Sequence, residues 1–114
     1  MKLIVAYIQP EKLSDVKQAL AAMDIKKISV ITNALGAGLQ KGYVEEYRGV
    51  QVQVSLRMKV RLEVAVNEDY VEPCIQAIIT GARTGKVGDG KIFVTELVEC
   101  IRIRTGERGS EAVG

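Results

Sequence analysis

The chain has 114 residues, of which 47% are hydrophobic, 26% charged and 4% aromatic, and its formal net charge is +2. This length fits a single domain with a hydrophobic core of its own. The balance of 16 basic against 14 acidic residues argues against a general nucleic-acid-binding surface, so an anion site must come from local clustering. The chain contains no His, which removes the commonest general base and metal ligand.

The sequence carries few signals for redox chemistry or for a membrane. Cys74 and Cys100 are far apart and form no ligand motif, so we expect small apolar residues rather than a disulfide or a metal site. The opening MKLIVAYIQP has one Lys and a very short apolar run, which does not fit a signal peptide. No segment approaches transmembrane length, and a cytoplasmic location is the expectation.

The first half of the chain predicts a strand, a helix and a second strand. Residues 2–8 (KLIVAYI) form the first strand, and both of its faces are apolar, so both should be covered. Pro10 and Glu11 suit a helix start. Apolar residues then follow at helical spacing, namely Leu13, Val16, Leu20 and Met23. Residues 26–32 (KKISVIT) predict the second strand.

The second half repeats this order. Residues 60–66 (VRLEVAV) alternate cleanly between apolar and other residues, which predicts a strand. A helix follows, with one apolar side formed by Val71, Ile75, Ile78 and Ile79. Residues 91–94 and 98–104 predict two further extended segments. The polar, glycine-rich tail after them is expected to be loose unless something orders it.

Two βαβ halves of similar size predict an α+β fold, a ferredoxin-like split βαβ sandwich. In that architecture both helices pack on one face of the sheet. The other face needs a cover too, because the strand at residues 2–8 is apolar on both sides. Another copy of the chain is the simplest cover, which predicts a homo-oligomer.

A long insert lies between the two halves, at about residues 36–56. A connection of this length in a compact domain is usually functional or mobile. Its second part, residues 50–54 (VQVQV), alternates like a strand with one apolar edge. Two interpretations stay open at this point: a β-hairpin that extends the sheet, or an arm that docks onto a partner protein.

Residues 84–94 (TGKVGDGKIFV) place three glycines and two lysines in one short stretch. Gly85, Gly90 and Lys91 fit the spacing of a phosphate-binding P-loop, but Ile92 stands where that motif needs Ser or Thr. The stretch also leaves a predicted helix and enters a predicted strand, whereas a P-loop leaves a strand and enters a helix. A P-loop NTPase is therefore rejected.

The same stretch can still bind an anion. Glycines let backbone N–H groups converge into a nest, and Lys86 and Lys91 add positive charge. Arg102 and Arg104 stand two apart on the predicted last strand, so they would share a face and offer paired hydrogen bonds to phosphate. The alternative is a helix C-cap at Gly85, a tight turn and two arginines on a solvated face.

At these residues the sequence resembles the PII nitrogen-regulatory signal-transduction proteins. Residues 84–94 and 101–108 (IRIRTGER) are similar to the two signatures of that family. Residues 40–49 (QKGYVEEYRG) are similar to the start of its T-loop. The match runs from Met1 to about Ser110, nearly the whole chain.

The resemblance implies one PII-like domain over residues 1–114, assembled as a homotrimer. Its T-loop would span about residues 37–56, its glycine-rich loop about 83–91 and its C-terminal loop about 102–114. ATP and ADP would compete for clefts between subunits, and 2-oxoglutarate would join ATP and magnesium there. The T-loop would regulate a partner protein, which is a transporter, an enzyme or a regulator, and with a transporter the protein would sit at the membrane periphery. Such a protein is a sensor and not an enzyme, and nucleic acid is not among its expected partners.

The resemblance also assigns roles to individual positions. It implies nucleotide contacts at Ser29, Gly36, Gly38, Ala65, Gly88, Asp89, Gly90, Lys91, Arg102 and Arg104. Residues 88–91 would cradle the phosphates, and the two arginines would reach them from the neighbouring side of the cleft. Gln40 would bind magnesium and 2-oxoglutarate, and Lys59 would pair with a 2-oxoglutarate carboxylate.

The chain departs from the family pattern at several positions. Val52 occupies the place of the T-loop tyrosine that many members modify, and Val50 that of a serine phosphorylated in some relatives, so these covalent switches are expected to be absent. Leu39 replaces an arginine, which removes one phosphate contact and could weaken ATP relative to ADP or alter the response to 2-oxoglutarate. One extra residue lies within residues 31–35. These departures predict a divergent PII subgroup.

Four alternatives stay beside this interpretation. The first is an adenine-nucleotide sensor that ignores 2-oxoglutarate and regulates a transporter or efflux system, as Leu39 would allow. An enzyme would have to use carboxylates such as Glu45, Glu46 and Glu63, and no pair of them argues for tuned acid–base chemistry. An RNA-recognition fold needs more aromatic residues for base stacking than 4%. A copper or zinc trimer would need softer ligands than carboxylates.

Overall fold

The computed structural model describes residues 1–37, 45–47, 50–52 and 56–114, with side chains described for 1–36 and 56–114. The elements run in the order β1 (Lys2–Ile8), η1 (Pro10–Lys12), α1 (Leu13–Ala22), β2 (Ser29–Ala37), β3 (Glu45–Tyr47), β4 (Val50–Val52), β5 (Leu56–Val66), η2 (Glu68–Tyr70), α2 (Val71–Ala82), β6 (Gly90–Glu96) and α3 (Ser110–Val113). Each half of the chain therefore supplies a strand, a helix and a strand, as the sequence predicts.

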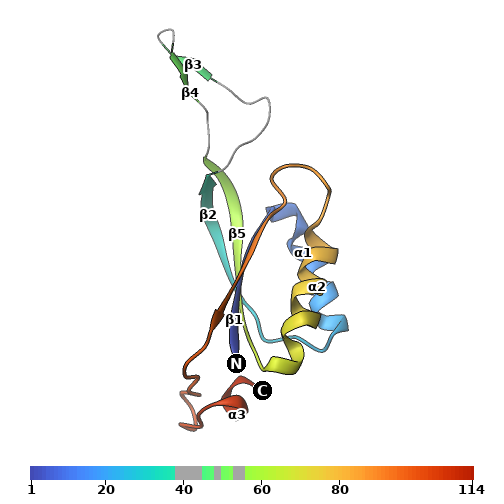
Figure 1. The fold of residues 1–114 in the computed structure, drawn as a ribbon, viewed down its shortest axis with the longest axis vertical. Helices are drawn as coiled ribbons and strands as arrows, with labels where there is room; N and C mark the ends of the chain where they lie inside the picture. Colours follow the sequence, from blue (N-terminus) through green and yellow to red (C-terminus); the bar gives the residue numbers. More distant parts are fainter. Residues whose placement is uncertain (38–44, 48–49, 53–55) are drawn as a thin grey trace.

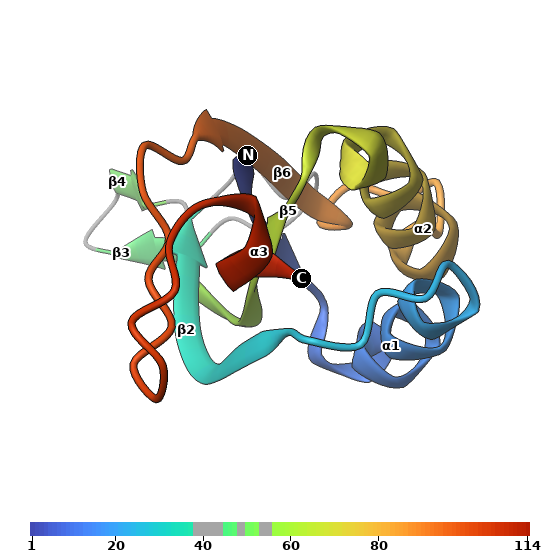
Figure 2. The ribbon, with the colours of Figure 1, turned by 90° about the horizontal axis from the view of Figure 1, so that it is seen from below.

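The main sheet has four antiparallel strands in the order β2-β5-β1-β6, and α1 and α2 lie side by side on one of its faces (Figures 1 and 2). This confirms the predicted ferredoxin-like split βαβ fold. The pairing of β1 with β6 defines two ends of the sheet. Ile8 lies opposite Gly90 at the end that we call the loop end, and Lys2 lies opposite Glu96 at the end that we call the tail end.

The core lies between the sheet and the two helices. Every second residue of β1 and β5 faces the helices, as expected for strands with a period of two. The buried side chains include Ile4, Ala6, Ile8, Val16, Leu20, Leu62, Val64, Val66, Cys74, Ala77 and Ile78. Gly81 allows α2 to approach α1 closely, because a Cβ at this position would lie 2.6 Å from the Cα of Val16. Burial raises the pKa of the Cys74 thiol to about 11, and Cys74 and Cys100 are both free, in line with the sequence prediction.

The opposite face of the sheet carries apolar side chains that no helix covers. Phe93 is 50% exposed and Ile31 is 41% exposed, while Val5 between the outer strands is buried. The rings of Tyr7 and Phe93 meet edge to face, with centroids 6.3 Å apart. Arg61 donates a hydrogen bond to the Tyr7 hydroxyl at 3.0 Å from the same face. The sheet thus presents the uncovered apolar face that motivated the prediction of a homo-oligomer.

The predicted strand at residues 26–32 is displaced along the chain. β2 begins at Ser29 and continues to Ala37, paired with β5 from Leu56 onward. A β-bulge interrupts this pairing, because β2 has one more residue than β5 between Ile31 and Ala34. Asn33 takes a positive φ of 62° there, which Asn tolerates better than most residues. The bulge lies in the segment where the resemblance predicts one residue more than the family pattern.

Part of the insert forms a hairpin, but this hairpin does not extend the main sheet as the first interpretation expected, and the docking arm stays a prediction. β3 and β4 pair with each other in a separate two-stranded sheet, with Glu45 opposite Val52 and Tyr47 opposite Val50. This small sheet stands beyond the ends of β2 and β5 (Figure 1). The side chains at positions 50 and 52 lie outside the described residues, as do Gly38, Leu39 and Gln40.

The prediction of a strand at residues 98–104 is wrong. Ile101 makes a single bridge to Arg108, and residues 103–105 form a turn. The backbone closes on itself instead, since Arg102 N–H donates to the Glu107 carbonyl and Gly109 N–H to the Cys100 carbonyl. Arg102 and Arg104 therefore do not share a face of one strand. The tail beyond them is ordered by contacts of its own and ends in α3.

Candidate functional site

The glycine-rich loop joins α2 to β6 at the loop end of the sheet. Gly85, Gly88 and Gly90 all have positive φ values, of 87°, 106° and 109°. Gly90 is also fixed by space, because a Cβ there would lie 1.7 Å from the carbonyl oxygen of Tyr7. The alternative that Gly85 caps α2 is wrong, since the C-cap residue is Arg83. The glycines therefore allow the backbone of the loop to adopt its left-handed conformations, and none of them caps the helix.

Asp89 holds this loop together from inside. Its carboxylate accepts hydrogen bonds from the backbone N–H groups of Thr84 at 2.8 Å and Gly85 at 2.9 Å, and from the Thr84 hydroxyl. The hydrogen bonds from Thr84, followed by the one from Gly85, lower the pKa of Asp89 below its ordinary value. Asp89 therefore shapes the loop, and two of the N–H groups that the sequence offers to an anion already have an internal acceptor.

Lys59 connects the loop to the base of the insert. Its side chain reaches from β5 to the loop, where Nζ donates to the Gly88 carbonyl at 2.7 Å. Gly36 on β2 makes way for the lysine stem, because a Cβ at Gly36 would lie 3.1 Å from its Cγ. The structure thus brings Gly36, Lys59 and Gly88 together at one end of the sheet, and the ligand roles that the resemblance gives them stay predictions.

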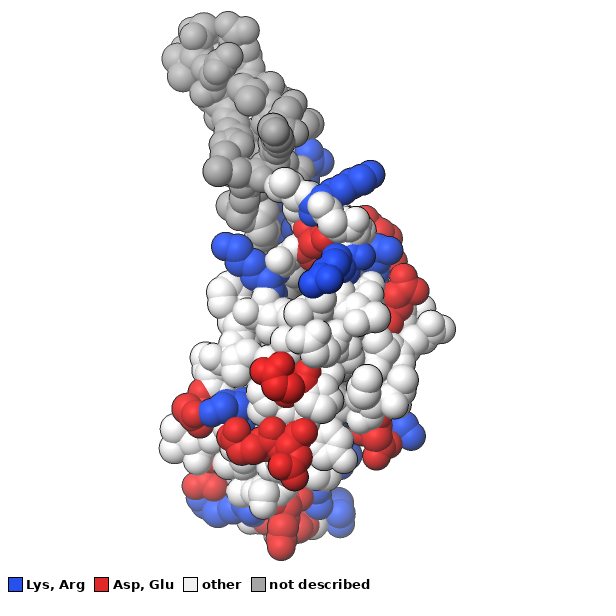
Figure 3. All heavy atoms as spheres, turned by 45° about the vertical axis from the view of Figure 1, so that its right-hand side comes forward, with Lys and Arg blue, Asp and Glu red and all other residues white. Residues whose placement is uncertain are grey.

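Positive charge gathers around this loop. Arg83, Lys86 and Lys91 are all exposed on the loop or on the strand that follows it. Figure 3 shows Lys and Arg side chains concentrated at the loop end, with Asp and Glu more frequent lower on the same face. A cavity of about 350 Å³ lies beside the loop, with an aliphatic floor from α2 and with Arg83, Asp89 and Lys91 in its wall. This end of the molecule therefore attracts anions.

The remaining predicted contacts lie farther down the sheet. Ser29 pairs with Glu63, and Ala65 pairs with Leu3 toward the tail end. Arg102 and Arg104 follow β6, which leaves the sheet at the tail end beside the start of β1. Within one chain, the glycine-rich loop and the two arginines therefore stand at opposite ends of the sheet (Figure 1).

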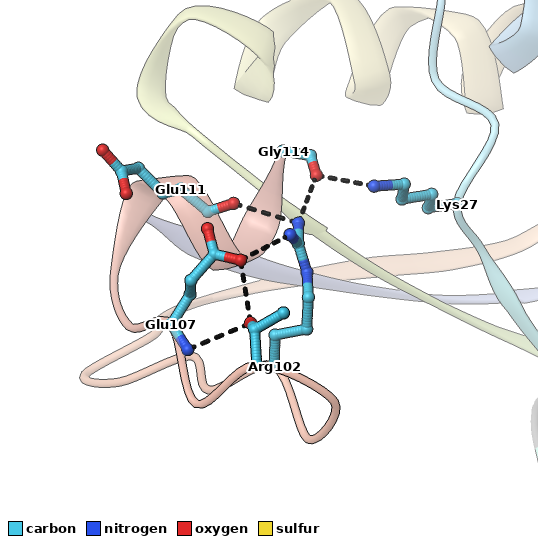
Figure 4. A network of polar contacts seen from close by, with 6 residues as sticks. Lys27, Arg102, Glu107, Glu111 and Gly114 are labelled. Atoms are coloured by element: carbon cyan, nitrogen blue, oxygen red, sulfur yellow. Dashed lines mark hydrogen bonds and ion pairs between the residues drawn. The ribbon is translucent and has the colours of Figure 1, made fainter.

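Arg102 is held by its own segment. Its Nη1 donates to the Glu107 carboxylate at 3.0 Å, and its Nη2 donates to the carbonyl oxygens of Glu111 at 3.1 Å and Gly114 at 3.0 Å. Lys27 donates to the same Gly114 oxygen at 2.6 Å (Figure 4). Sequence reasoning missed these partners. The bond from Thr84 to Asp89 had a local signal, since Asp accepts nearby backbone N–H groups, but Lys27 had none.

The described residues contain no group of three or more His, Cys, Asp or Glu side chains that could hold a metal ion. The residue that the resemblance assigns to magnesium, Gln40, lies outside them. Within the described part of the chain, no helix is long and apolar enough to span a membrane. The cytoplasmic location stays a prediction.

A split βαβ sandwich with a glycine-rich loop and a paired-strand extension at the same end is the architecture that the resemblance predicted. A family model described as nitrogen regulatory protein P-II matches residues 1–107. The chain belongs to the PII nitrogen regulatory protein family. This is a family of signal-transduction proteins and not of enzymes, which confirms the prediction on that point and sets the enzyme alternative aside.

Individual relatives are similar over nearly the whole chain. The nitrogen regulatory protein P-II of Azospirillum brasilense is 50% identical over 113 residues, which cover 99% of this chain and 100% of that protein. Nitrogen regulatory protein P-II 1 of Escherichia coli K12 is 48% identical with the same coverage. A crystal structure of Arabidopsis thaliana PII bound to citrate matches with a TM-score of 0.78 at 35% identity, covering 98% of this chain and 88% of that one.

Proposed function

We propose that the chain is a sensor that binds ATP or ADP in clefts between three copies of itself and regulates a partner protein through the insert at residues 37–56. One observation carries the proposal. The glycine-rich loop precedes β6 at one end of the sheet, and the segment with Arg102 follows β6 at the other end, so a phosphate site that uses both needs a loop from one chain and an arginine from the next. The uncovered apolar face, with Phe93 and Ile31, supports the association of copies.

In this proposal residues 88–91 cradle the phosphates, and Arg102 and Arg104 of the neighbouring copy complete the site. Ser29, Gly36, Gly38 and Ala65 line the nucleotide. Gln40 holds magnesium with the ATP phosphates, and Gln40 and Lys59 bind 2-oxoglutarate. The citrate of the Arabidopsis relative is a tricarboxylate, and it supports small anionic effectors in this family.

Complementation between two inactive variants tests the shared site. By calorimetry, Lys91→Ala and Arg102→Ala should each weaken ADP binding roughly tenfold to a hundredfold, because each removes a charged hydrogen-bond donor. When the two variants are co-expressed and mixed trimers are purified, about one site in three should combine an intact loop with an intact arginine and bind normally, because each mixed ring of three contains one such junction. Mixed oligomers without any normal site would place loop and arginine in the same chain. Unchanged affinity in both single variants would refute the site.

The same titration separates the two sensor interpretations. ATP with magnesium and 2-oxoglutarate should strengthen each other's binding if the usual effector is retained. If nucleotides bind and 2-oxoglutarate changes nothing, the chain is the adenine-nucleotide sensor that Leu39 allows. The partner protein, whether transporter, enzyme or regulator, would then be sought by capture experiments with the ADP-bound and the ATP-bound protein.

A further inference from the structure

The guanidinium of Arg102 already has partners within its own chain. Its two terminal nitrogens donate to one carboxylate and two carbonyl oxygens, all from Glu107, Glu111 and Gly114 (Figure 4). The side chain is only 29% exposed in this arrangement. Three of the four N–H groups on these terminal nitrogens are engaged, so a phosphate that binds both nitrogens must displace at least one of these oxygens.

Two residues from the tail end of the sheet keep this segment in place. Lys27, between α1 and β2, donates to the Gly114 carbonyl at 2.6 Å, and Asn67, after β5, donates to the Ser110 carbonyl at 3.2 Å. The helix α3 has four residues, far fewer than a helix needs to be stable alone. Its position therefore depends on contacts such as these.

A cavity lies between α3 and the tail end of the sheet. This cavity has a volume of about 350 Å³, and its wall includes Lys26, Lys27, Asn67, Val113 and Gly114. The contacts that hold α3 are polar and exposed, so each contributes little and can exchange with water. A segment held in this way can leave Arg102 when a stronger acceptor arrives.

We propose that Lys27 and Asn67 are positioning residues that keep residues 107–114 docked on Arg102 and thereby set the affinity of the nucleotide site. Docking competes with phosphate for the same donors, so the free protein binds nucleotide more weakly than its site allows. Nucleotide binding releases the segment. The inference rests on the proposed function, in which Arg102 binds phosphate.

The test is the affinity for ADP, measured by calorimetry, of variants that undock α3. Lys27→Met and Asn67→Ala should each bind ADP roughly threefold to tenfold more tightly, since one hydrogen bond that opposes binding is lost. For Lys27→Met this is the opposite of what loss of a positive charge would do by itself. Lys26→Met is the matched control, because it loses the same charge while its Nζ lies near Asp24, at 3.7 Å. It should bind ADP no more tightly than the wild type, and Lys27→Arg should restore wild-type affinity.

Hydrogen exchange reports docking without any nucleotide. The amides of Val113 and Gly114 donate within α3, to the carbonyl oxygens of Gly109 and Ser110, and should exchange faster in Lys27→Met and in the wild type with ADP. Equal ADP affinity in Lys27→Met, Lys26→Met and the wild type would overturn this inference alone. A wild type that binds no ADP would overturn the proposed function and this inference with it.

Discussion

The two ends of the sheet are held in different ways. At the loop end, Asp89 bonds to Thr84 only five residues away, and Gly90 fits against the neighbouring strand. At the tail end, Lys27 bonds to Gly114 across 87 positions of the chain, and Asn67 to Ser110 across 43. The loop end is therefore organised by local backbone chemistry, and the tail end by long-range polar contacts on the surface.

This difference separates a fixed half of the proposed site from an adjustable half. The glycine-rich loop takes its shape from backbone conformations that other residues adopt only at a cost. The arginine half is placed by exposed hydrogen bonds, which contribute little individually and exchange with water. A sensor gains from such a division, because a ligand can displace the second kind of contact and not the first.

The largest expected effect comes from adding one methyl group at each end. Gly90→Ala should lower the free energy of unfolding by at least about 3 kcal/mol, because its Cβ would overlap the Tyr7 carbonyl oxygen. Gly106→Ala at the tail end is the matched control: its φ is also positive, at 74°, but a Cβ would meet nothing within 4 Å. It should cost only about 1 kcal/mol for the left-handed conformation. Urea unfolding followed by circular dichroism measures both, and similar losses would contradict the difference between the ends.

The sequence allowed the fold to be predicted because its apolar periodicity was clean. Residues 60–66 alternate, residues 2–8 are apolar on both faces, and the two strands pair in register. The helix residues Val16, Leu20 and Ile78 lie in the core as predicted, whereas Met23 is 47% exposed, and Cys74 and Ala77 are buried although the apolar pattern did not include them. The boundaries of β2 could not be predicted as well from the sequence. Its start at Ser29 and its bulge at Asn33 depend on pairing with β5, which local sequence does not specify.

The candidate site also has one part that the sequence could predict and one part that it could not. The loop could be predicted from its glycines, since positive φ and close approach are properties of the residue type. The segment with Arg102 could not, because IRIR alternates like a strand although no neighbouring strand pairs with it along its length among the described residues. Tertiary contacts, from Lys27 for example, decide its conformation. The roles of Gln40 and Lys59 came only from the resemblance.

A smaller effect tests whether Lys59 stiffens the loop end before any ligand arrives. Lys59→Met should lower the free energy of unfolding by about 1 kcal/mol, because the Gly88 carbonyl loses a charged donor at 2.7 Å. Lys86→Met removes the same charge from an exposed position in the same loop and should change stability by less than about 0.5 kcal/mol. Thermal and urea unfolding compare the two variants. Equal losses of unfolding free energy in the two variants would mean that the hydrogen bond from Lys59 to Gly88 contributes no stability beyond the effect of removing one positive charge.

The smallest effect is a pH dependence confined to the glycine-rich loop. The pKa of Asp89 is lowered in the folded protein, chiefly by the Thr84 hydrogen bonds, so its contribution to loop order is present above the ordinary Asp pKa of 3.8. That contribution is lost as the pH falls through the lowered value, when the carboxylate takes up a proton. Amide chemical shifts of Thr84 and Gly85, followed by NMR from about pH 6 to about pH 2, should show a midpoint below that of an ordinary Asp.

Two variants sharpen this last measurement. Thr84→Val removes the hydroxyl donor and keeps the backbone N–H, so the midpoint should rise part of the way toward the ordinary value. Asp89→Asn removes the titrating group, and the two amides should then show no transition in this range. A transition that persists in Asp89→Asn would mean that another group reports there, and the loop would owe its shape to its glycines without the carboxylate. A midpoint unchanged by Thr84→Val would assign the lowered pKa to the backbone donors of Thr84 and Gly85 alone.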